Sequence, residues 1–120
     1  MSDGGEVFSE AEGCFELQLY EEALKAVDSL SPSMQQLPRA LRVRAACAFA
    51  TRNFELAESL ALKLPDPYEV FAARLLHELA AIRHLMGHTT RARQLIMHAI
   101  RVRADQRLAI MDDPALHGLS

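Results

Sequence analysis

Apolar residues recur along this chain at the spacing of amphipathic helices, in six segments separated by short turns. In the segment that begins at Tyr20, the apolar positions Ala23, Leu24, Val27 and Leu30 follow at helical intervals, which places them on one face of an α-helix. The same pattern predicts helices over residues 6–17, 20–30, 38–51, 54–64 and 68–86. A sixth helix is predicted from Thr89 or Thr90 onward, a short helix over residues 105–111 and a last turn at residues 113–116.

Glycine, proline and capping residues mark the ends of these segments. Ser31–Pro32 is expected to stop the second helix, and residues 33–37 are expected to form a loop or at most one turn. Pro38 suits the first turn of the next helix, and Gly87 suits a left-handed helix end. The Pro-Asp-Pro stretch at residues 65–67 is expected to end the fourth helix, and Asp113 is expected to cap a turn that starts at the following proline.

Two columns of alanine repeat with a nearly constant period. The first column is Ala11, Ala45 and Ala80, and the second column is Ala23, Ala57 and Ala92, each with successive spacings of 34 and 35 residues. A period of about 34 residues is typical of stacked helix–turn–helix units. Small side chains at these points would let the two helices of each hairpin approach closely.

The predicted fold is therefore all-α: a right-handed α-solenoid of three stacked helix–turn–helix repeats with a short C-terminal capping helix. The repeats cover about residues 6–34, 38–66 and 68–104, and the capping segment covers residues 105–120. Residues 1–5 are expected to be disordered, and residues 6–120 are expected to form one domain.

Several stretches resemble the tetratricopeptide repeat family. Residues 19–24 (LYEEAL), 53–58 (NFELAE) and 87–92 (GHTTRA) are similar to the turn and second-helix start of that repeat, and Pro32 and Pro65 resemble its closing proline. Residues 11–17 with 21–24, and residues 108–116, also resemble the opening and closing segments of a group of bacterial repeat proteins of undefined role. The family's turn glycine is present at Gly87 and is replaced by Gln18 and Arg52 in the first two units.

The resemblance implies a non-enzymatic module that binds a peptide or helix of a partner protein in a concave groove lined by the first helix of each hairpin. Helical geometry then selects the residues offset by about one position from the buried set. These are Phe8, Glu12, Phe15, Arg39, Arg42, Phe49, Arg74, His77 and His84. The arginines are expected to pair with a carboxylate of the partner. A self-assembling homodimer is the alternative, since the aromatic residues in this set would otherwise leave apolar surface in water.

Composition and charge narrow the choice of function. Half of the residues are apolar, only 6% are aromatic and there is no tryptophan, so we expect an aliphatic core. A net charge of −3 argues against general nucleic-acid affinity. Residues 1–37 nevertheless hold eight acids and one base, which suits either a solvated surface or a patch complementary to a partner. The five arginines between residues 91 and 107 could likewise contact an acidic partner, including nucleic acid or the N-terminus of another copy, or simply form a solvated face.

No catalytic or cofactor motif accompanies these patterns. His77, His84 and His88 share a helical stripe, which makes a His-based metal-binding or enzymatic protein a less favoured alternative, because no acid lies at ligand spacing from His77 and Gly87 should end the helix before His88. Cys14 and Cys47 match no metal spacing and are interpreted as core residues. Without an apolar span or a signal peptide, the chain is expected to be cytoplasmic, with no metal, cofactor or enzymatic activity.

Overall fold

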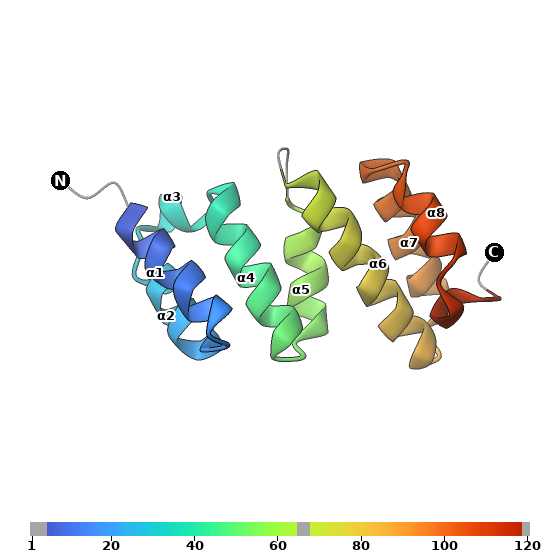
Figure 1. Ribbon diagram of the computed structural model, residues 1–120, viewed down its shortest axis with the longest axis horizontal. Helices are drawn as coiled ribbons and strands as arrows, with labels where there is room; N and C mark the ends of the chain where they lie inside the picture. The colour runs from blue at the N-terminus through green and yellow to red at the C-terminus, as the bar shows by residue number, and fades with distance from the viewer. Residues whose placement is uncertain (1–4, 65–67, 119–120) are drawn as a thin grey trace. The chain divides into compact units, whose positions relative to one another are not determined.

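A computed structural model describes the backbone of residues 5–64 and 68–118, and every regular element in these two ranges is helical. The prediction that residues 1–5 are disordered lies outside the described residues for residues 1–4, and it is wrong for Gly5, which begins the first helix. The chain divides into two compact units, residues 1–64 and 65–120 (Figure 1). The first unit contains the first two predicted repeats, and the second contains the third repeat with the capping segment.

The first unit is built from two helical hairpins. Helices α1 (Gly5–Glu16) and α2 (Tyr20–Asp28) form the first, and helices α4 (Pro38–Ala50) and α5 (Phe54–Ala61) form the second (Figure 1). The one-turn helix α3 (Pro32–Gln35) connects them, and both α1 and α2 pack against α4. Helix α4 therefore lies against helices of both hairpins, which explains why its buried residues cover more than one face.

The second unit contains one long hairpin and a shorter C-terminal part. Helices α6 (Glu69–Leu85) and α7 (Thr89–Val102) pair along their length. Helix α8 (Gln106–Met111) packs against both of them, and the 3₁₀ turn η1 (Pro114–Leu116) returns to α6 (Figure 1). None of the helices within the described residues is long and apolar enough to cross a membrane.

Some helix ends differ from the predicted positions. Helix α2 ends at Asp28, and Ser31–Pro32 begins α3 instead of stopping α2, because the Ser31 hydroxyl accepts a hydrogen bond from the Met34 amide at 3.4 Å. Helix α5 ends at Ala61, before residues 65–67, which lie outside the described residues. Neither Thr89 nor Thr90 caps α7, since its N-terminal boundary residue is His88 and Thr89 is already helical.

The three long hairpins share one turn geometry. Gln18, Arg52 and Gly87 have φ values of +63°, +64° and +84° and follow one another at the repeat spacing of 34 and 35 residues. In each turn the next residue donates its amide to the carbonyl five positions earlier: Leu19 to Cys14 at 2.7 Å, Asn53 to Ala48 at 2.8 Å and His88 to Arg83 at 2.8 Å. This is the Schellman ending, in which a left-handed residue closes a helix. The first two turns therefore adopt the glycine conformation without glycine.

Small and aliphatic side chains fill the interior. All six alanines of the two repeating columns, Ala11, Ala23, Ala45, Ala57, Ala80 and Ala92, have no exposed surface. The largest fully buried side chains are Leu76, Leu79, Leu95, Val27 and Cys47. Burial raises the pKa of the Cys47 thiol to about 11, because the thiolate would lose its hydration.

Candidate protein-binding site

The residues predicted to line a groove occur in both units. In the first unit the structure overturns the role assigned to Phe8. Its side chain is only 5% exposed and belongs to the core between α1, α2 and α4. The Arg39 guanidinium covers the ring at 5.0 Å from its centroid. Phe8 therefore presents no aromatic surface to a ligand.

Glu12 and Arg39 bind each other across α1 and α4. Arg39 Nη2 donates to Glu12 Oε1 at 2.7 Å, and Arg39 Nε donates to Oε2 at 3.2 Å, which is the two-point geometry of an arginine–carboxylate pair. The hydrogen bond from Arg39 lowers the pKa of the Glu12 carboxyl, and the positive charges of Arg39 and Arg42 lower it further. Arg39, one of the three arginines expected to pair with a partner's carboxylate, is thus already bound to Glu12 within the chain.

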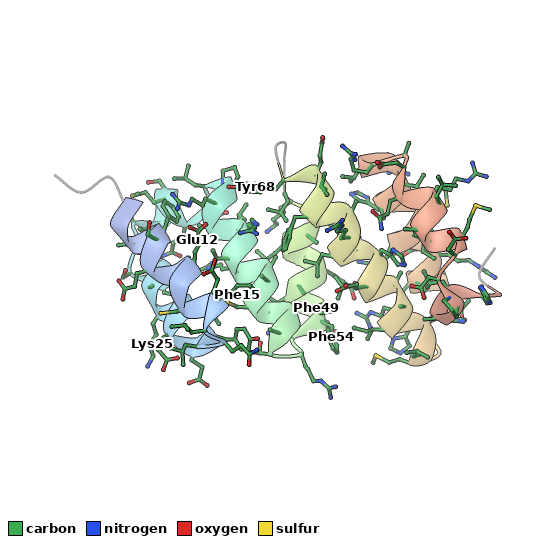
Figure 2. All side chains as sticks on the ribbon, in the orientation of Figure 1. Glu12, Phe15, Lys25, Phe49, Phe54 and Tyr68 are labelled. Atoms are coloured by element: carbon green, nitrogen blue, oxygen red, sulfur yellow. The ribbon has the colours of Figure 1, made fainter. Side chains whose placement is uncertain are left out.

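Phe15 and Phe49 lie near the turns that end α1 and α4 (Figure 2), and each meets an aromatic residue of its own hairpin. The Phe15 and Tyr20 ring centroids are 5.6 Å apart, and those of Phe49 and Phe54 are 5.8 Å apart. Both phenylalanines are half-buried, so each contributes mainly to the packing of its hairpin end and leaves part of its ring accessible. Arg42, also half-buried, completes the predicted set in this unit.

In the second unit His77 joins α6 to the C-terminal part. Its Nε2 lies 2.7 Å from Asp113 Oδ2, and its Nδ1 lies 2.9 Å from Gln106 Nε2. Its side chain is only 12% exposed. No acid lies near His77 in the sequence, because Asp113 is 36 residues away and approaches only when the chain folds back. His77 therefore anchors the C-terminal segment instead of lining a groove.

Two contacts, one with His77 and one with a backbone amide, hold the Asp113 carboxylate in place. As predicted, this carboxylate caps the last turn by accepting the Ala115 amide at 2.9 Å. The hydrogen bond from that amide lowers the pKa of Asp113, and the contact with His77 lowers it further. One carboxylate thus stabilises η1 and links it to α6.

The two remaining predicted residues differ in exposure. Arg74 is exposed on α6, whereas His84 is half-buried, and its Nδ1 is buried without a hydrogen-bond partner. Across residues 5–64 and 68–118, no group of three or more His, Cys, Asp or Glu side chains is arranged to hold a metal ion.

A cleft that the sequence analysis did not identify lies between α7, α8 and the residues around η1. Its volume is about 460 Å³, within the range of pockets that hold ligands. Its lining is mainly aliphatic and consists of Ile96, Ile100, Arg107, Ile110, Met111, Leu116, His117 and Gly118. Ile110 and Leu116 are buried, whereas Met111 is 62% exposed at the cleft.

More apolar surface occurs on the same helices. Leu108 on α8 is 68% exposed, and Met97 on α7 is 63% exposed. Isolated apolar residues on a surface need no explanation, but an apolar cleft on helices that also expose large apolar side chains often marks a binding site. Arg107 and His117 provide the polar groups of the cleft lining.

The sequence contained part of the signal for this cleft. Ile96 and Ile100 widen the apolar stripe of α7 in the sequence, although the helix already buries Ala92, Leu95 and Ala99. An apolar stripe wider than its own hairpin can cover predicts a further contact, and α8 covers only part of it. The position of η1, however, depends on the distant contact between His77 and Asp113.

Comparison with protein-family models, with characterised proteins and with solved structures finds no match to this chain. Its candidate function therefore depends on the geometry of the cleft.

Proposed function

We propose that this chain is a non-enzymatic protein-interaction module, and that the cleft between α7, α8 and η1 binds the apolar face of a helix from a partner protein. The aliphatic cleft lining is the observation that carries the proposal. Transfer of apolar side chains from water into such a cleft is favourable by about 25 cal/mol per Å² of apolar surface buried.

The shape of the cleft favours a helix as the bound segment. Two helices and a turn form its walls, and they leave exposed backbone hydrogen-bonding partners only at helix ends, so an extended peptide would find no strand edge to pair with. A helix satisfies its own backbone and needs only a groove for apolar side chains at helical spacing. The resemblance to tetratricopeptide repeats supports the same class of function.

The cleft also has the support that a preformed site requires. The Asp113–His77 and His77–Gln106 contacts hold α8 and η1 against α6, and Arg103 forms an ion pair with Glu69 at 3.4 Å close to the start of α8. A cleft held open before binding costs less ordering entropy when a ligand enters.

Selection of helical peptides from a random display library against the full chain tests the proposal. We expect enriched peptides to carry large apolar residues at i, i+3 or i+4, and i+7, and to bind Met111→Asp at least about tenfold more weakly than wild type, a loss of about 1.4 kcal/mol. Met111 is mostly exposed, so this substitution should leave the fold intact.

Met86→Asp is the matched control, because Met86 is a methionine of the same unit with 55% exposure and lies outside the cleft lining. Peptides that bind wild type and Met86→Asp equally, and Met111→Asp poorly, would support the cleft. Failure to enrich any peptide, or equal binding to all three proteins, would refute it.

A further inference from the structure

From the charges around the cleft, we infer that it accepts the acidic turn of the first hairpin of a second copy of this chain. The inference rests on the proposed role of the cleft as a protein-binding site and names its occupant as a turn instead of a helix. Like a helix, this turn satisfies its own backbone amides, since Leu17, Gln18 and Leu19 donate to Gly13, Phe15 and Cys14. The acidic tip is our name for residues 16–22, which are the turn between α1 and α2 with the adjoining helix ends. In the contact, its exposed leucines would enter the apolar cleft.

The acidic tip combines exposed leucines with exposed carboxylates. Leu17 is 72% exposed and Leu19 is 45% exposed, and Glu16, Glu21 and Glu22 are exposed beside them. An apolar side chain as exposed as Leu17 gains free energy by leaving water.

The backbone of the tip is held in place before any contact forms. Gln18 donates its amide to the Phe15 carbonyl at 2.9 Å, and Leu19 donates to the Cys14 carbonyl at 2.7 Å. Because the turn is already ordered, docking would cost little conformational entropy.

The charges of the two surfaces are complementary. Arg107 lines the cleft, and Arg93 and Arg101 are exposed on α7, whereas the tip carries three glutamates and no base. Opposite charges of this kind direct encounter and fix the register of a contact. The distribution of charge along the sequence agrees with this complementarity, since residues 1–37 hold eight acids and one base.

The equivalent turn of the third hairpin shows that exposed apolar residues alone do not select the tip. That turn also exposes Leu85 and Met86, at 76% and 55%, but its neighbours are Arg83, His84 and His88. The positive charge of Arg83 at that turn would be repelled by Arg107 at the cleft wall, so charge favours the first turn over the third.

Because the tip and the cleft are different surfaces, the contact is heterologous, and this property gives a decisive test. Leu17→Asp removes the projection and leaves the cleft, whereas Met111→Asp removes the cleft and leaves the projection. Sedimentation equilibrium of each full chain, at about 10 μM to 1 mM, covers the affinities that a small contact would have.

We expect wild type and the control Met86→Asp to self-associate, with a dissociation constant that rises with salt. Each of Leu17→Asp and Met111→Asp alone should stay at the monomer mass of 13.4 kDa. An equimolar mixture of the two variants should form a species of twice that mass, since one intact tip then meets one intact cleft.

A wild type that stays monomeric throughout, or a mixture of the two variants that stays monomeric while wild type associates, would overturn the inference. The proposed function is tested independently of self-association. It predicts that Met111→Asp weakens binding of the selected peptides whether or not the chain associates with itself. A monomeric wild type that binds peptides in the cleft would thus reject the second copy as occupant and retain the cleft as a binding site.

Discussion

The left-handed residues that close the first two hairpins offer a direct test of the repeated turn. Gln18 and Arg52 have φ near +63°, a conformation that costs a residue with a Cβ about 1–2 kcal/mol and costs glycine almost nothing. Glycine in turn loses more freedom on folding, by about 0.4–1 kcal/mol. The difference predicts that Gln18→Gly and Arg52→Gly each raise the free energy of unfolding by about 0.5–1 kcal/mol.

The third turn supplies the reciprocal experiment. A Cβ built on Gly87 would meet no atom within 4 Å, so the cost of Gly87→Ala comes from its φ of +84° and not from a clash. We expect Gly87→Ala to lower the free energy of unfolding by about 0.5–1.5 kcal/mol. The strain of alanine at positive φ exceeds the benefit of its more restricted unfolded chain.

Urea unfolding followed by far-ultraviolet circular dichroism measures these differences, and unchanged slopes would show that the unfolded state is comparable. Gln18→Ala and Arg52→Ala are the matched controls, since they remove an exposed side chain and keep the Cβ. If the glycine variants are no more stable than these alanine variants, the backbone conformation assigned to the turns is wrong.

Three further predictions concern packing, charge and thiol chemistry. Ala45→Leu should destabilise the chain by about 1–3 kcal/mol through overpacking, whereas Ala50→Leu, at an exposed position of the same helix, should change stability by less than about 0.5 kcal/mol in the same urea assay. Glu12 has a lowered pKa when folded, so its contribution is present above its ordinary pKa of 4.5 and is lost as the pH falls through the lower folded value. Glu12→Gln should therefore be less stable than wild type at pH 7 by under about 1 kcal/mol, and a deficit that persists at pH 2 would contradict the ion pair with Arg39. Cys47 should react with a thiol reagent much more slowly than the half-buried Cys14, because burial raises its pKa to about 11; equal rates in mass-spectrometric labelling would refute its burial.

Most of the secondary structure could be predicted from the local periodicity of apolar residues. The long helices were predicted within a few residues because each repeats apolar positions at helical spacing, and the six repeating alanines all lie in the interior. Gly87 and Asp113 were predicted correctly as a left-handed helix end and a cap, since both effects depend only on neighbouring residues. The prediction that Ser31–Pro32 only stops a helix was wrong for a local reason too. A serine before a proline is also a typical helix start, and here Ser31 caps α3.

The candidate site was harder to predict, because side-chain partners come from distant parts of the chain. Phe8 and Arg39 have the register of groove residues, yet α1 and α4 approach closely enough for Arg39 to cover the ring and bind Glu12. His77 was assigned to the same groove, but Asp113 and Gln106 reach it from the C-terminal segment. No spacing rule connects residues 29 or 36 positions apart that belong to non-equivalent elements.

The isoleucine methyl groups provide the most direct test of the α7–α8 cleft as a binding site. The chain has four isoleucines, of which Ile96, Ile100 and Ile110 line the cleft and Ile82 does not. In proton–carbon spectra of methyl-labelled full chain, addition of a selected helical peptide should shift the three cleft resonances and leave that of Ile82 in place. Unchanged cleft resonances under saturating peptide, or a shift confined to Ile82, would contradict binding in the cleft.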